Sequence, residues 1–253
     1  MPSGNVGSFP SSTMRTLCIT FGIILNLKVL YSLIIIMKLS YAITVCNESK
    51  DLYSLISFLK RVKDEEDEIN VLVDTKHVTP QVLRVLDNFK NDIVTCERSF
   101  DGDFSAHRNF HTSQCSGDYI FIIDPDEMPK EKLIKGIKGI IDETNIDLIK
   151  VPRINICLGA TDTWYEDHGF TVNDFDWVNW PDYIDRVYKN KPSEIKYDKS
   201  LHESITGYDK FISISPHPQM AILHVKSVDK DDHRWTDGKF KIREDDNLYD
   251  SLM

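Results

Sequence analysis

An acidic turn follows an apolar run near the middle of the chain. Residues 119–123 are apolar, and carboxylates follow at Asp124, Asp126 and Glu127. Carboxylates crowded into one turn repel one another unless a cation lies among them. Such hard oxygen ligands suit Mg²⁺ or Mn²⁺, which also keep water and phosphate oxygens as ligands. The turn therefore predicts a divalent-cation site for a phosphorylated substrate, with a solvated acidic turn as the alternative.

Polar residues also stand where two earlier apolar runs end. Asn47 and Glu48 follow the run at 41–46, and Asp74 follows the run at 69–73. Their oxygens can accept hydrogen bonds from a nucleobase or from ribose hydroxyls, as an acidic residue does in dinucleotide-binding folds. The alternative for each is a turn former or an acid at a helix N-terminus.

A basic residue precedes the acidic turn. Arg108, with Asn109 beside it, lies in a segment with a helical pattern. Its guanidinium can either contact a phosphate or hold the acidic turn in place. An exposed arginine on a helix surface is the alternative.

Hydrophobic patterns predict the elements that position these side chains. Short apolar runs predict strands, and apolar stripes at helical spacing predict helices. The predicted strands are 41–46, 69–73, 92–96, 119–123 and 147–151, and the predicted helices start near Ser49, Thr79, Phe104 and Pro129. This alternation predicts an α/β fold, a mostly parallel mixed sheet flanked by helices, with ligands beyond the carboxyl ends of the strands.

The composition argues against one class of partner. The chain has 253 residues, a formal net charge of −10 and a pI near 5.3, whereas nucleic-acid binding needs a basic surface. Its five cysteines are scattered, without zinc-ligand spacing or a secreted disulfide pattern. We therefore expect no nucleic-acid partner, reduced cysteines and a cytoplasmic protein.

Residues 17–36 form a largely apolar stretch that is long enough to span a bilayer. Asn26 and Lys28 oppose insertion, because a central lysine costs roughly 2.5–3.5 kcal/mol. The stretch is therefore either a membrane anchor, giving membrane association through 17–36, or an upstream extension that is not translated. The predicted organisation is an apolar extension at 1–36, one domain at 37–227 and a charged tail at 228–253.

Residues 160–185 break the regular pattern and are rich in aromatic and acidic side chains. Aromatic faces with polar surroundings suit a sugar-binding surface. The same side chains could instead close the core of a loop-rich region. The sequence leaves these two interpretations open, and it predicts a loop-rich second half.

Several segments together resemble the successive blocks of family 2 glycosyltransferases. The similarity covers about residues 38–227 and is most specific in Asp-Phe-Ser-Ala-His-Arg-Asn at 103–109 and Gly-Asp-Tyr-Ile-Phe-Ile-Ile-Asp-Pro-Asp-Glu at 117–127. It is strongest to the bacterial branch that includes lipopolysaccharide-core glucosyltransferases. Further similar segments are 44–48, 71–74, 179–183, Arg186, 202–203 and 222–226. The chain departs from the family pattern at Thr75-Lys76-His77 and at Pro125, which bears on donor identity more than on fold.

The resemblance implies a GT-A fold, a nucleotide-diphosphate sugar donor, a glycan or other hydroxyl acceptor, and Mn²⁺ or Mg²⁺. It also implies inversion at the anomeric carbon. In this interpretation Asn47, Glu48 and Asp74 line the nucleotide pocket. Asp124 and Asp126 bind the metal and the diphosphate, with Arg108 nearby.

An inverting transfer needs a carboxylate that takes the proton of the acceptor hydroxyl. Asp182 and Glu203 are the candidates, and we favour Asp182 because Arg186 would pair with it if the segment were helical. His224 is a candidate third metal ligand, although a lone histidine is more often structural.

Two rival functions remain open at this point. A nucleotidyltransferase of related fold would usually carry a Gly-rich, basic loop for a triphosphate, and no such loop follows Val45. A non-catalytic carbohydrate-binding protein would keep the fold without turnover.

Overall fold

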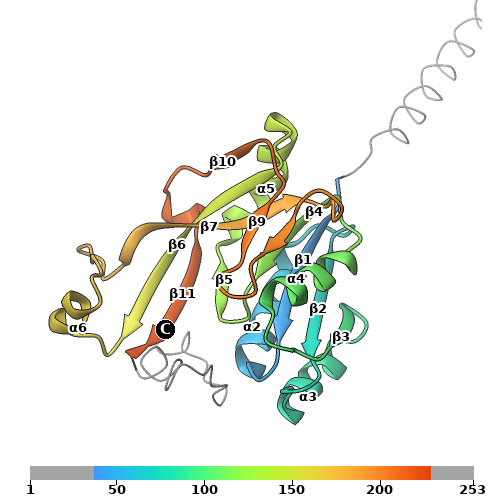
Figure 1. Ribbon diagram of the computed structural model, residues 1–253, viewed down its shortest axis with the longest axis horizontal. Coiled ribbons are helices and arrows are strands. Elements are labelled where there is room, and N and C mark those ends of the chain that lie inside the picture. The colour runs from blue at the N-terminus through green and yellow to red at the C-terminus, as the bar shows by residue number, and fades with distance from the viewer. Residues whose placement is uncertain (1–36, 229–253) are drawn as a thin grey trace, which may run out of the picture. The chain divides into compact units, whose positions relative to one another are not determined.

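The computed structural model describes residues 37–228, and a nine-stranded mixed sheet forms the centre of this part of the chain (Figure 1). The strand order is β3-β2-β1-β4-β7-β6-β11-β5, and β10 pairs with β6. The apolar stretch at 17–36 and the tail beyond 228 lie outside the described residues. Within 37–228, no helix is long and apolar enough to cross a membrane.

The first half of the described chain alternates strands and helices, as the sequence predicts. Strands β1 (Leu39–Val45), β2 (Glu68–Asp74), β3 (Val94–Arg98) and β4 (Tyr119–Ile123) alternate with helices α2 (Ser49–Val62), α3 (Pro80–Asn88) and α4 (Phe104–Ser113). These four strands pair in parallel. Their carboxyl ends therefore meet at one edge of the sheet, where polar residues that follow them can form a site.

Local sequence explains why the helices form where they do. The side-chain oxygen of Thr79 accepts a hydrogen bond from the backbone N–H of Val82, and Pro80 occupies the first turn of α3. In α2, an apolar stripe packs on the sheet, and each of its side chains contributes roughly 1.5–3 kcal/mol through burial. The stripe consists of Leu52, Leu55, Ile56 and Leu59, all fully buried.

The second half completes the sheet with strands that run in both directions. Its elements are β5 (Glu127–Pro129), α5 (Glu131–Thr144), β6 (Leu148–Leu158), α6 (Asp162–Asp167), β7 (Val178–Lys189), β8 (Lys196–Asp198), β9 (Ser204–Thr206), β10 (Phe211–Ser213), the 3₁₀ turn η1 (Pro218–Met220) and β11 (Ile222–Ser227). The mostly parallel mixed sheet with flanking helices confirms the predicted fold class.

One sequence prediction in this half needs correction. Pro129 does not open the helix: it ends β5 and pairs with Ile222 of β11, and the helix begins two residues later, at Glu131. The condition under which Arg186 would pair with Asp182, a helical segment, is not met, because both residues lie in β7. This segment is a strand because β4 and β6 provide pairing partners for it.

Strand β7 joins the two halves of the sheet. It runs antiparallel to both β4 and β6, so that Phe121 pairs with Val187 and Val151 pairs with Ile184. The amino-terminal part of β7 consequently lies at the same edge as the carboxyl ends of β4 and β6. This placement brings β7 side chains to the acidic turn.

Helix α4 is anchored by a buried histidine. His111 is fully buried, with Nε2 3.2 Å from the carbonyl oxygen of Asn70 and Nδ1 3.3 Å from the hydroxyl of Thr44. Burial lowers the pKa of His111 to about 3, so the ring is neutral at neutral pH. Because α4 is fixed to β1 and β2 in this way, Arg108 is held at the edge of the sheet.

Candidate functional site

A cleft of about 720 Å³ lies at the carboxyl ends of the parallel strands. The predicted site residues that line it are Glu48, Asp74, Arg108, Asp124, Asp126, Glu203 and His224. Asn47 is buried in the turn after β1 and is not among the lining residues. Asp182 lies behind the lining residue Arg153 and contacts it directly.

A buried ion pair between Glu127 and Arg186 supports the acidic turn. Glu127, the first residue of β5, has no exposed surface, and Arg186 of β7 is 8% exposed. Arg186 donates from Nη2 to Oε1 at 2.6 Å and from Nε to Oε2 at 3.1 Å. This bidentate geometry matches the planar guanidinium to the carboxylate and offsets part of the cost of burying both charges.

Asp124 is held between two arginines. Arg108 donates to its Oδ1 at 3.0 Å, and Arg186 donates to its Oδ2 at 2.7 Å. Burial alone would raise the pKa of Asp124, but the charges of Arg186 and Arg108 lower that pKa well below its usual range. Asp124 is therefore a stable carboxylate, and both of its oxygens already face cations.

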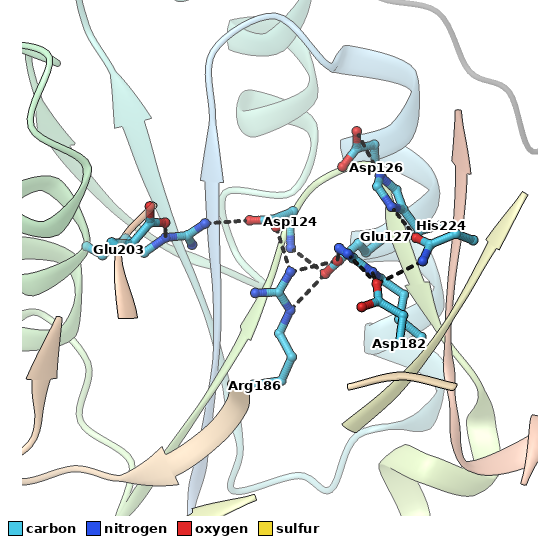
Figure 2. A network of polar contacts seen from close by, with 10 residues as sticks. Asp124, Asp126, Glu127, Asp182, Arg186, Glu203 and His224 are labelled. Atoms are coloured by element: carbon cyan, nitrogen blue, oxygen red, sulfur yellow. Dashed lines mark hydrogen bonds and ion pairs between the residues drawn. The ribbon is translucent and has the colours of Figure 1, made fainter. Parts of the chain in front are cut away.

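The ion pairs continue on both sides of this centre as an alternating series (Figure 2). Arg108 donates from Nε to Glu203 at 2.7 Å. Arg153 of β6 donates to Glu127 at 3.1 Å and to Asp182 at 2.6 Å. The guanidinium of Arg108 contacts the acidic turn through Asp124, and its contact with a phosphate stays a prediction.

Asp182 is fixed by a different partner from the predicted one. Three donors converge on its Oδ2, namely Arg153 Nε at 3.0 Å, Arg153 Nη2 at 2.6 Å and Asn155 Nδ2 at 2.8 Å. Arg186 instead contacts Asp124 and Glu127. Burial acts to raise the pKa of Asp182, but Arg153 and Asn155 outweigh it and lower the pKa below its ordinary value.

A hydrogen-bond relay selects the tautomer of His224. Since Asp182 accepts only, the amide of Asn155 must turn its Nδ2 toward Asp182 and its Oδ1 toward His224 Nδ1, 3.0 Å away. His224 then donates from Nδ1, and its Nε2 faces Asp126 Oδ2 at 3.6 Å. Either a proton on Nε2 or a metal cation bound by both groups would make this contact favourable.

Two of the residues predicted to contact a nucleotide, Asp74 and Glu48, also line the cleft. Asp74 Oδ1 accepts from the backbone N–H groups of Lys76 and Phe100, both at 3.0 Å, and its Oδ2 lies 2.5 Å from His77 Nδ1. Glu48 Oε2 accepts from two backbone N–H groups of its own turn. Burial, with the Asp126 charge also contributing, raises the pKa of Glu48.

Sequence reasoning assigned no role to Arg153 or Asn155, and it counted Glu127 only among the carboxylates of the predicted cation site. All three belong to the polar network around Asp182 and Arg186, since Arg153 donates to Glu127 and both Arg153 and Asn155 donate to Asp182. A signal for two of them exists, because Arg153 and Asn155 interrupt the otherwise apolar β6 at alternate positions, which puts both on one face of the strand. Glu127 stood in the acidic turn, but nothing in the sequence distinguishes its buried side chain from those of its neighbours.

Comparisons with known proteins agree with this architecture. A family model described as "Glycosyl transferase family 2" matches residues 40–213. The curated protein poly(ribitol-phosphate) beta-N-acetylglucosaminyltransferase TarS of Staphylococcus aureus is 25% identical over 124 residues, which cover 47% of this chain and 22% of that protein. The chain thus spans about a fifth of the length of this relative.

Solved structures of S. aureus TarS have a similar fold. TarS 1–349 in complex with UDP-GlcNAc matches with a TM-score of 0.53 and 18% identity, covering 75% of this chain and 59% of that one. The same fragment with UDP matches with a TM-score of 0.52 and 17% identity, covering 78% and 62%. The relatives found here do not support the more specific resemblance to lipopolysaccharide-core glucosyltransferases, which stays a prediction.

The buried pair yields a prediction about stability. Changing Glu127 to Gln removes the charge between Arg186 and Arg153, so the free energy of unfolding should fall by roughly 3–5 kcal/mol. Denaturant unfolding measures this loss. Glu131→Gln is the matched control, because exposed Glu131 pairs only with Lys135 on the surface of α5 and its replacement should change little. Equal effects of the two variants would contradict a central role for Glu127.

Proposed function

This chain belongs to glycosyl transferase family 2, and we propose that it transfers a sugar from a nucleotide-diphosphate sugar to a hydroxyl acceptor. We further propose inversion at the anomeric carbon and dependence on Mn²⁺ or Mg²⁺. The observation that carries the proposal is the pair formed by Asp126 and His224, which face each other in the cleft at the end of β4. The UDP and UDP-GlcNAc in the TarS complexes support a donor of this kind.

The charges of the network fit a divalent cation. The network contains five carboxylates and three arginines, so these eight side chains carry a net charge of −2, and Lys226 is a further cation that lines the cleft. Two ligands at about 2.1 Å from one ion lie roughly 3–4 Å apart, a range that includes the 3.6 Å between Asp126 and His224. One carboxylate and one imidazole leave the remaining positions to phosphate oxygens and water.

We assign the metal to Asp126 and His224, and a supporting role to Asp124. The two arginines on Asp124 already neutralise it, so that it positions Arg108 and Arg186 along the cleft. When bound, the cation would neutralise the diphosphate leaving group. Asn155 contributes indirectly, because its amide keeps the Nε2 lone pair of His224 available.

The remaining residues bind and activate the substrates. Asp74 and Glu48, which line the cleft, offer acceptor oxygens to the nucleoside. Asp182 takes the proton of the acceptor hydroxyl, since Arg153 and Asn155 keep it ionised at neutral pH. Glu203 is the alternative base, but its contact with Arg108 favours a role in holding that arginine.

Metal dependence can be measured without turnover. Calorimetry of UDP binding should show affinity with Mn²⁺ that falls by at least about tenfold with a chelator, because the cation offsets the diphosphate charge. The isosteric variant Asp126→Asn should show the same loss in the presence of Mn²⁺.

Asp87→Asn provides the control, because Asp87 is an exposed carboxylate on α3. It should bind UDP as the unchanged protein does. Equal affinity with and without chelator would remove the metal from the proposal, and a deficit shared by both variants would show that the assay does not report on the site.

The assignment of the base yields a kinetic prediction. Asp182→Asn should lower kcat by a factor on the order of 10²–10⁴ with little change in donor affinity, because the loss concerns proton transfer alone. The acidic limb of the kcat/KM profile should also disappear, which a merely structural defect would not cause. Steady-state kinetics on any acceptor that turns over gives both readouts.

Glu203→Gln is the comparison variant for this experiment. We expect it to keep kcat, because Glu203 holds Arg108 and does not take the proton. If Glu203→Gln loses turnover and Asp182→Asn keeps it, the two roles must be exchanged. If both variants keep turnover, neither carboxylate is the base.

A further inference from the structure

We propose that the acceptor is an uncharged glycan and that it docks on residues 159–181. This segment runs from the end of β6 into the first residues of β7, directly before Asp182. This inference rests on the proposed function, since it names the acceptor class of the same site. Its evidence is the combination of exposed aromatic rings, uniform negative charge and proximity to Asp182.

The aromatic side chains of this segment do not enter a core. Phe175 is 70% exposed, and both Trp177 and Trp180 retain partial exposure. Their rings form a continuous group, with centroids 5.2 Å apart for Phe175 and Trp177 and 5.1 Å apart for Trp177 and Trp180. A second group surrounds Trp164, whose ring stacks on His168 at 4.1 Å. One exposed ring and its partly exposed neighbours together present an aromatic surface to solvent, which is typical of an interaction surface.

The segment is held in shape before any ligand arrives. Asn173 Oδ1 accepts from the backbone N–H groups of Phe175 and Trp177, both at 3.0 Å. The side chain of Thr161 accepts from the N–H of Trp164 and caps α6. A backbone fixed in this way loses little conformational entropy on binding, which favours recognition of a ligand by the rings that it carries.

The charge of the segment selects the kind of partner. Residues 159–181 contain five carboxylates, all exposed, and no lysine or arginine. The carboxylates are Asp162, Glu166, Asp167, Asp174 and Asp176. A phosphate-rich polymer, an anionic membrane surface and a second copy of the same segment would all be repelled. An uncharged glycan is not repelled, and its hydroxyl groups can donate to these carboxylates.

The position of the segment links docking to transfer. Val178 pairs with Asn155, and Asn155 donates to Asp182. Trp180 stands two residues before Asp182 in β7, and Figure 1 shows that α6 lies beyond the carboxyl end of β6. A glycan on the ring group of Phe175, Trp177 and Trp180 therefore approaches the proposed base.

Binding to an array of uncharged, sulfated, phosphorylated and sialylated oligosaccharides tests the proposal on the full chain. We expect the protein to retain uncharged glycans only. Phe175→Ala and Trp177→Ala should each weaken that retention by about tenfold, the loss expected from one aromatic contact of about 1.4 kcal/mol. Phe211→Ala is the matched control, because Phe211 is 53% exposed on β10, outside the segment, and its replacement should not change retention.

Three results would overturn the docking proposal. They are retention of anionic glycans, no retention of any glycan, and equal retention by Phe175→Ala, Trp177→Ala and Phe211→Ala. UDP binding measured on the same samples separates the two claims. If the unchanged protein binds UDP but does not show the expected glycan retention, only the acceptor inference is refuted. If the unchanged protein does not bind UDP, the proposed donor is refuted.

Discussion

Glu127 places a full negative charge in the interior, and this charge constrains the rest of the site. An isolated buried carboxylate costs several kcal/mol, so the surrounding strands must supply cations. Arg186 and Arg153 do so from β7 and β6. Arg186 also pairs with Asp124. The arginine that the buried Glu127 requires therefore also fixes the position of Asp124 in the acidic turn.

The same constraint unites the two halves of the fold. The acidic turn belongs to the parallel half, and two of the three arginines that neutralise it, Arg153 and Arg186, come from β6 and β7, which pair antiparallel to each other. Through Arg153 the charge series reaches Asp182, and through Asn155 it sets the tautomer of His224. The proposed metal ligands and the proposed base are thus oriented by one connected network.

Local patterns predicted the part of the structure that depends on local chemistry. The strands that end before Asn47, Asp74 and Asp124 are confirmed, because buried parallel strands form short apolar runs with polar residues after them. Strand β7 was missed, since its mixed aromatic and polar sequence becomes a strand only between β4 and β6. The partners of Arg186 and Asp182 could not be predicted for the same reason, because pairing across the sheet has no local signature.

The central claim is that Asp126 and His224 bind the cation while Asp124 keeps its two arginines. The most direct test is a crystal structure with Mn²⁺ and UDP, in which anomalous scattering locates the metal. The account predicts a single manganese bound by Asp126 and by Nε2 of His224, with Arg186 still on Asp124. A manganese bound by Asp124 with Arg186 displaced, or one remote from His224, would contradict it.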